Sequence, residues 1–214
     1  MSLQAVAQSY GNNHPFDLKK FNLGLLMGVT YNTYNVKEQI NIVDNGVLLQ
    51  NIQLVPRYGL NFGIITNMNL HKQVSMRFIP QVSLEERDFT YYFADSTVNR
   101  KIEASYLNFP VTFQFKTGYY RAMRTYVVAG AQYGVNLASN KRVRNDKNLL
   151  KISNQDLSLV FGFGFNIYGD RIKLSPEIRY SLGLLNLYEP QFTSHANAIE
   201  LLSSQVLSIN VNFE

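Results

Sequence analysis

Apolar and polar residues alternate with period two along most of this chain. The clearest stretch runs from Glu103 to Lys116 and reads E-A-S-Y-L-N-F-P-V-T-F-Q-F-K. Its odd positions are apolar from Leu107 to Phe115, and most of its even positions are polar. Because successive side chains of a β-strand point to opposite faces, the pattern predicts a strand with one apolar and one polar face.

Seven other segments repeat this alternation. We predict eight strands, at about 21–35, 55–69, 74–87, 103–116, 125–138, 156–168, 172–185 and 207–213. The connections alternate between long and short, at 36–54, 70–73, 88–103, 117–124, 139–155, 169–171 and 186–200. Outer-membrane barrels have short periplasmic turns and longer outer loops. The sequence therefore predicts an all-β fold: an eight-stranded antiparallel up-and-down transmembrane β-barrel of outer-membrane type over residues 21–214. Residues 1–20 are predicted to be a polar leader outside the barrel.

The volume of the apolar side chains indicates which face points outward. Together the apolar faces hold roughly 45 mostly bulky side chains, more than the interior of an eight-stranded barrel can contain. Nine of the thirteen glycines have the parity of the polar face, where missing side chains make room for long ones. The polar face is therefore predicted to line the lumen. The alternative is a soluble barrel or sandwich with an apolar interior.

Composition narrows the compartment and the chemistry. Hydrophobic residues make up 46% of the chain, but no run approaches the ~20 apolar residues of a transmembrane helix. Only 16% of residues are charged, against about 25% in soluble domains. The absence of cysteine excludes disulfides and thiol chemistry. The first residues lack the basic and apolar regions of a signal peptide. We favour an exported protein whose signal peptide is absent from this sequence, with a short cloning remnant inside residues 1–20. The alternative is a chain that never had a signal peptide.

Charged residues recur on the predicted lumen face. Unpaired burial of charge costs several kcal/mol, so these groups are expected to form a network of salt bridges that fills the barrel. A narrow path that favours anions is the functional alternative. The predicted lumen charge network consists of Arg57, Arg77, Glu85, Arg87, Lys116, Glu177 and Arg179. Lys173 and Asp156 have the same parity.

The three histidines are scattered, at His14, His71 and His195. His195 lies beside Ser194 and near Ser203, as a lipid-modifying enzyme would require, but chance proximity within a loop explains this better. We therefore predict no catalytic residue, metal site or cofactor.

The largest concentration of basic residues falls in the predicted outer loop 139–155. We expect this loop to contact the phosphates of lipopolysaccharide, because anionic surfaces attract cations, or to dock a protein partner. Nucleic acid is not an expected partner, since the loop would lie outside the cell. The residues concerned are Lys141, Arg142, Arg144 and Lys147, followed by Lys151.

Prolines interrupt three of the predicted strands. Pro80, Pro110 and Pro176 each lack the N–H that a closed barrel uses in its hydrogen-bond ladder. Local bulges or kinks are therefore expected at all three positions.

Three segments resemble a known family. Tyr106–Lys116 looks like the Tyr-Leu-Glu-Ile-Pro-Leu strand of Bacteroidetes outer-membrane β-barrel domains, with Asn108 in place of the commoner acidic residue. Arg124–Gly130 is similar to the Pro-Tyr-Val-hydrophobic-Gly strand that follows there, and Phe21–Asn32 looks like their opening strand. Phe213, in the last strand, resembles the aromatic signal that the barrel-insertion machinery reads.

Within that group the chain most resembles the PorT family of the type IX secretion system. The resemblance implies a protein of the Gram-negative outer membrane that contacts membrane lipids and other secretion-system proteins. It also implies a non-enzymatic accessory or assembly role in protein export, because eight strands are too narrow to conduct folded cargo. The alternative is a small-solute porin-like or structural barrel without a role in secretion.

Overall fold

The computed structural model describes residues 14–38, 43–44, 47–48, 51–55, 57–92, 97–120, 122–137, 153–186 and 199–214. A single helical turn, α1 (Pro15–Leu18), precedes the strands. The strands are β1 (Phe21–Glu38), β2 (Val43–Asp44), β3 (Val47–Leu48), β4 (Asn51–Val55), β5 (Arg57–Asn69), β6 (Val74–Phe78), β7 (Gln81–Tyr92), β8 (Thr97–Lys116), β9 (Met123–Asn136), β10 (Gln155–Tyr168), β11 (Lys173–Gly183) and β12 (Ile199–Phe213). None of the described residues belongs to a helix with the length and apolar character that a membrane crossing requires.

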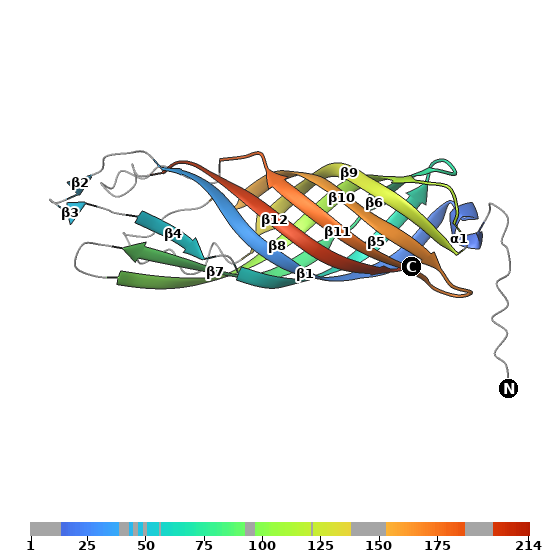
Figure 1. Cartoon of the computed structure of the whole chain (residues 1–214), viewed down its shortest axis with the longest axis horizontal. Helices are drawn as coiled ribbons and strands as arrows, with labels where there is room; N and C mark the ends of the chain where they lie inside the picture. Colours follow the sequence, from blue (N-terminus) through green and yellow to red (C-terminus); the bar gives the residue numbers. More distant parts are fainter. Residues whose placement is uncertain are drawn as a thin grey trace, which may run out of the picture.

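The strands close into a barrel. Each is antiparallel to its neighbours, and β1 pairs with β12 on one side and β5 on the other. Among the described residues, ten strands belong to this sheet. They occupy eight positions around the barrel wall, here called staves: β4 and β5 follow one another along one stave, and β6 and β7 follow one another along the next. The remaining staves are β1 and β8 to β12. The predicted eight-stranded antiparallel barrel is confirmed, and Figure 1 shows its tilted strands.

The two faces of the sheet are oriented as the sequence predicts. Leu23 and Tyr58 on the outer face are 72% and 73% exposed, whereas Arg77 and Lys173 on the inner face are fully buried. The alternative of an apolar interior is therefore wrong. One apolar group does lie inside, where Leu26, Ile65 and Ile79 pack together within the lumen.

Glycines make room for these inner side chains. A Cβ on Gly28 would lie 2.2 Å from Oδ1 of Asn210 and 2.4 Å from Oδ1 of Asn61, closer than atoms can approach. On Gly164 it would meet the hydroxyl of Tyr126 at 2.6 Å. At both glycines the added atom would collide with lumen side chains, which agrees with the predicted role of the glycines on the polar face.

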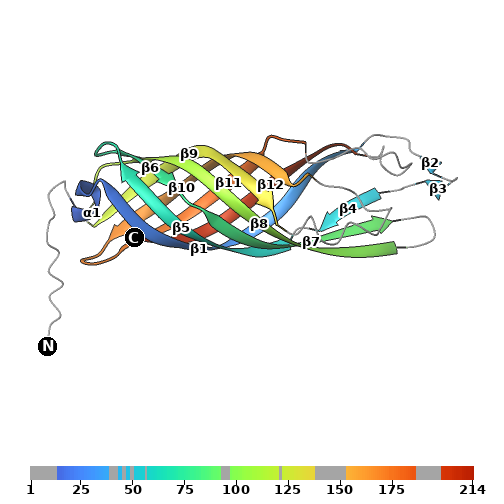
Figure 2. The ribbon, with the colours of Figure 1, turned by 180° about the vertical axis from the view of Figure 1, so that it is seen from behind.

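The barrel wall extends further at one end than the sequence indicates. The predicted loop 88–103 is wrong, because β7 and β8 pair without a register change from Gln81↔Asn108 to Tyr92↔Thr97. The predicted loop 36–54 also contains the end of β1 and the strands β2 to β4. Figures 1 and 2 show β4, β7 and β8 projecting beyond the barrel at the end opposite α1.

No register shift, and hence no bulge, accompanies the three prolines, but the strand is interrupted at Pro80, because β6 ends at Phe78 and β7 begins at Gln81. Thr66↔Phe78 and Gly63↔Gln81 keep one register on both sides of Pro80, and Pro110↔Gln132 continues the pairing of β8 with β9. Pro176 likewise keeps its place in the pairing of β11 with β12.

The physical reason is that a proline ring fits an extended backbone and removes only the N–H. The proline carbonyls still accept hydrogen bonds, from Ile79 N–H to Pro110 at 3.1 Å and from Ile64 N–H to Pro80 at 3.0 Å. The ladder therefore loses single bonds and keeps its register.

Candidate functional site

A network of ion pairs crosses the lumen. Arg77 on β6 reaches Glu177 on β11, with Nη1 and Oε2 3.5 Å apart, and these two staves are four neighbours apart in either direction around the ring. Arg179, also on β11, donates from Nη2 to the other oxygen of Glu177 at 2.6 Å. All three side chains point inward because they have the lumen-facing parity of their own strands, which is odd in β6 and in β11, and all three are buried.

Glu214 completes this network from the end of the chain. It directly follows β12, and its side chain accepts from Nη2 of Arg77 at 2.5 Å and from Nζ of Lys173. Its backbone also exchanges both hydrogen bonds with Lys173 at the start of β11. The hydroxyl of Tyr126 donates to Glu177 at 2.9 Å, and the guanidinium of Arg77 lies over the Tyr126 ring. The centre of the barrel is therefore filled by paired charges.

A second cluster closes the end of the barrel that faces α1 (Figure 1). The carboxylate of Asp17 accepts from Nζ of Lys116 at 2.9 Å and from Nη1 of Arg124 at 2.8 Å. It also accepts from the hydroxyls of Tyr119 at 2.5 Å and Tyr168 at 2.8 Å. Four donors from β8, β9, β10 and the turn between β8 and β9 thus converge on one side chain.

This arrangement corrects the prediction of a leader outside the barrel for residues 14–20. His14 is buried, and its ring lies 5.5 Å from that of Phe16 and 4.6 Å from that of Tyr168. The carbonyl of Phe16 accepts from the side-chain amides of Asn22 and Asn69. Residues 14–20 therefore pack against the end of the barrel. Residues 1–13 lie outside the described part of the chain.

The pKa values of groups in this end segment follow from the same contacts. Burial alone would raise the pKa of Asp17, but the charge of Lys116 and the hydrogen bonds outweigh it, so the pKa falls well below its ordinary value. Burial lowers the pKa of His14. Burial and the hydrogen bond to Asp17 raise the pKa of Tyr119. At neutral pH the carboxylate of Asp17 is charged and His14 is neutral.

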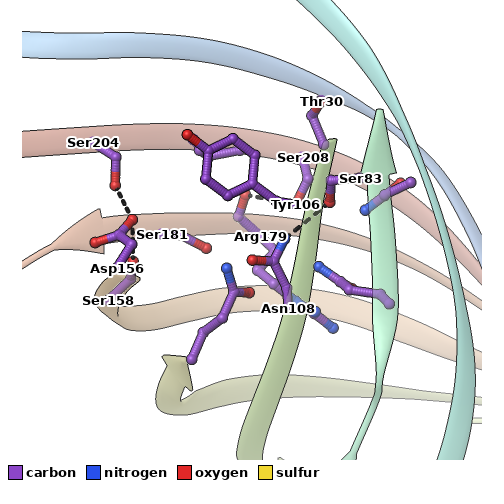
Figure 3. Close-up of a pocket in the computed structure, with 14 residues that line it drawn as sticks. Thr30, Ser83, Tyr106, Asn108, Asp156, Ser158, Arg179, Ser181, Ser204 and Ser208 are labelled. Carbon is purple, nitrogen blue, oxygen red and sulfur yellow. Dashed lines mark hydrogen bonds between the residues drawn. The ribbon is translucent and has the colours of Figure 1, made fainter. Parts of the chain in front are cut away.

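A small polar cavity lies in the lumen on the other side of the central network (Figure 3). Its volume is about 30 Å³, which is enough to hold water. Asp156 in its wall accepts from Ser158 at 3.3 Å and from Ser204, and the side-chain amide of Asn108 donates to Ser83 at 3.0 Å. The cavity is therefore lined by hydroxyl and amide groups that can form hydrogen bonds with ordered water.

The structure brings together three of the seven predicted lumen charges and places a fourth in another cluster. Arg77, Glu177 and Arg179 form the central network, and Lys116 belongs to the cluster around Asp17. The side chains of Arg57, Glu85 and Arg87 lie outside the described residues, as do the predicted loop residues Lys141, Arg142, Arg144 and Lys147 and the pair Ser194 and His195. Ser203 is buried in β12.

Three important residues were not predicted. Glu214 continues the inward parity of Asn210 and Asn212, so extending the last strand by one residue would have found it. Arg124 has the inward parity of β9, but the strand was predicted to begin one residue later. Asp17 gives no such signal, because it precedes the strands and its partners are far away in sequence.

The fold and lumen define an outer-membrane β-barrel: apolar side chains face outward, and charged ones are paired within. The model of the "Outer membrane protein beta-barrel domain" matches residues 6–189, and the chain belongs to that family. It is a protein of the outer membrane.

Solved outer-membrane proteins are similar in fold. Neisserial surface protein A is 11% identical, with a TM-score of 0.46, and the match covers 91% of this chain and 98% of that one. OprG from Pseudomonas aeruginosa is 10% identical, with a TM-score of 0.49 and coverage of 89% and 94%. Ail, the attachment invasion locus protein of Yersinia pestis, is 10% identical, with a TM-score of 0.35 and coverage of 92% and 99%. No curated protein matches this chain in sequence.

Proposed function

We propose that this protein is a non-conducting, non-enzymatic outer-membrane barrel that serves as an accessory or assembly component of type IX protein secretion. The observation that carries the proposal is the charge network from Arg77 through Glu177 to Arg179, which occupies the middle of the lumen. With its interior filled, the barrel acts through the surfaces that it presents at either end of the membrane.

The secretion role rests on the resemblance of the whole chain to the PorT family, within the group of outer-membrane barrels that the three segments resemble. All three segments lie within strands of the barrel here: Phe21–Asn32 in β1, Tyr106–Lys116 in β8 and Arg124–Gly130 in β9. At the position of the commoner acidic residue, Asn108 faces the lumen and bonds to Ser83, so the substitution replaces a charge with a neutral hydrogen bond.

Partners follow from this proposal. The outward apolar face is suited to membrane lipids, and the basic residues Lys141, Arg142, Arg144 and Lys147 are suited to the phosphates of lipopolysaccharide. Other proteins of the secretion system would bind the outer loops or the short-turn end, which by the usual orientation of such barrels faces the periplasm.

Deletion of the gene in a bacterium that encodes this chain tests the proposal. We expect cargo of the type IX system to be lost from the culture medium and to accumulate in the periplasm. Restoring the wild-type gene should return secretion, and the amount of a periplasmic marker in the medium controls for leakage. Normal secretion of all type IX cargo after deletion would contradict the proposed role.

The second candidate is a small-solute porin, and one observation favours it. The described lumen side chains carry a surplus of cations, since Arg77, Lys116, Arg124, Lys173 and Arg179 face only Asp17, Glu177, Glu214 and Asp156. Single-channel recording in planar bilayers separates the two candidates. A filled lumen should give no conductance steps, whereas reproducible anion-selective steps would establish the porin.

A further inference from the structure

The cluster around Asp17 has the construction of a binding site whose ligand is part of the same chain. We propose that the α1 end of the barrel is a receptor for a short aspartate-containing peptide segment, which Asp17 and its neighbours occupy in cis. A segment of another polypeptide with the same chemistry would take their place when α1 withdraws.

The receptor groups are held in place by contacts that do not involve Asp17. Arg124 donates from Nε to the carbonyl of Thr117 at 2.8 Å and from Nη2 to that of Lys72 at 3.1 Å, and its guanidinium lies over the Tyr119 ring. Lys116 donates to Oδ1 of Asn69 at 3.0 Å. These cations therefore keep their positions when the carboxylate leaves, as a preorganised site requires.

The receptor groups of the site are positively charged, so its ligand must be an anion. Lys116 and Arg124 are each 4% exposed, and Asp17 is the carboxylate that both contact. Buried cations that lose their partner are strongly destabilising. An empty site would thus attract a replacement carboxylate.

The site recognises a peptide and not only a free acid. Side-chain amides of Asn22 and Asn69 bind the carbonyl of Phe16, and Asn69 also binds that of Lys19 at 2.7 Å. The ring of Tyr168 contacts the ring of His14, which stacks on Phe16, and the backbone N–H of His14 donates to the hydroxyl of Tyr119 at 3.2 Å. A ligand that presents one carboxylate together with backbone carbonyls and an aromatic ring is an aspartate-containing peptide segment.

The cis segment has little secondary structure of its own to hold it in place. The helical turn is four residues long, and its internal backbone bonds run from Asp17 N–H to the His14 carbonyl and from Lys19 N–H to the Pro15 carbonyl. A turn this short has little stability of its own. Its position depends on the contacts of the site.

A labelled peptide of sequence His-Pro-Phe-Asp-Leu-Lys, acetylated and amidated, serves as the probe against the full-length protein in lipid nanodiscs. Fluorescence anisotropy measures its binding to wild type, to Asp17→Ala and to Asp17→Lys, in which repulsion from Lys116 and Arg124 expels α1. Each variant is first checked for the heat-modifiable gel mobility of a folded barrel. The matched control peptide carries asparagine in place of aspartate.

We expect saturable binding to both variants and none to wild type, whose site is occupied. The asparagine peptide should bind at least about tenfold more weakly, the loss expected for a charge-assisted hydrogen bond. Adding Lys116→Met to Asp17→Ala should abolish binding. The proposal is overturned if the aspartate peptide binds neither variant, if both peptides bind equally, or if acetate at the peptide's concentration displaces it completely. The test uses purified protein, so its outcome is independent of the proposed secretion role.

Discussion

At the scale of single residues, Glu177 holds the centre of the lumen together. It contacts Arg77 and Arg179, accepts from Tyr126, and is 2% exposed. The guanidiniums of Arg77 and Arg179 both contact this one carboxylate. Its negative charge therefore offsets the repulsion between the two cations as well as the cost of burying them. Its charge should therefore contribute more to stability than any surface charge does.

Glu177→Gln tests that contribution while keeping the shape of the side chain. We expect the free energy of unfolding to fall by about 3–5 kcal/mol, the usual effect of removing one partner of a buried ion pair. Urea unfolding in phospholipid vesicles, followed by tyrosine fluorescence, measures the change. The exposed charge in Arg171→Gln is the control and should change stability by less than about 0.5 kcal/mol. Equal unfolding midpoints for Glu177→Gln and wild type would contradict the stabilising role of this network.

Alternation is sufficient to place Arg77, Glu177 and Arg179 in the lumen, because the odd or even position of a residue along its strand determines whether its side chain faces the lumen or the membrane. It does not determine which charges meet, since depth along the barrel depends on the stagger between staves. Strand ends are harder still: Arg124 and Glu214 were missed because each lies at the very end of a strand or just beyond it. The partners of Asp17 are about a hundred residues away or more, beyond what a local pattern can indicate.

At the scale of elements, α1 should leave the barrel end as the pH falls. The pKa of His14 in the seated segment is below its ordinary value of 6.5, because burial disfavours the charged ring. Protonation therefore favours the released state, and the contribution of His14 is complete above pH 6.5 and is lost as the pH falls from there through the lowered pKa. The pKa of Asp17 is also lowered, but its contribution is lost only below the ordinary value of 3.8.

Leu18→Cys provides a label for this transition, because the chain has no other cysteine and Leu18 is 66% exposed. A nitroxide at this position should become more mobile in electron paramagnetic resonance spectra as the pH falls below 6.5. His14→Phe in the same background keeps an aromatic ring without a titrating group, so its spectrum should stay constant until the pH is below 3.8. A transition unchanged by His14→Phe would assign the release to another group.

The strands themselves show where element prediction works and where it fails. Most starts and ends agree within three residues, since alternation stops where a turn begins. The outer hairpin of β7 and β8 was predicted as a loop because its polar residues lack clear alternation, although the backbone pairing continues. Pairing beyond the membrane needs no apolar face, so hydrophobic periodicity cannot reveal it.

At the scale of the whole molecule, insertion depends on the outward face staying apolar. Phe113 is 41% exposed on the outer wall, and its neighbour Gln114 is fully buried in the lumen. A charge at mid-bilayer costs on the order of a few kcal/mol, so Phe113→Asp should block insertion. Gln114→Glu adds the same charge one residue away on the inner face and should still insert. Heat-modifiable mobility of outer-membrane fractions measures both, and normal insertion of Phe113→Asp would refute the assigned orientation.

The molecule closes its lumen twice, once at the α1 end and once in the middle. Asp17 secures the first closure, while Arg77 and Glu177, two of the largest fully buried side chains, form the second. Closures in series must both open before an ion can pass. Asp17→Ala alone should therefore remain silent in planar bilayers. Combining it with Arg77→Ala and Glu177→Ala removes the side chains that span the centre and should produce small conductance steps. Steps from Asp17→Ala by itself would mean that the central ion pairs do not seal the barrel and that the helical turn is its only barrier.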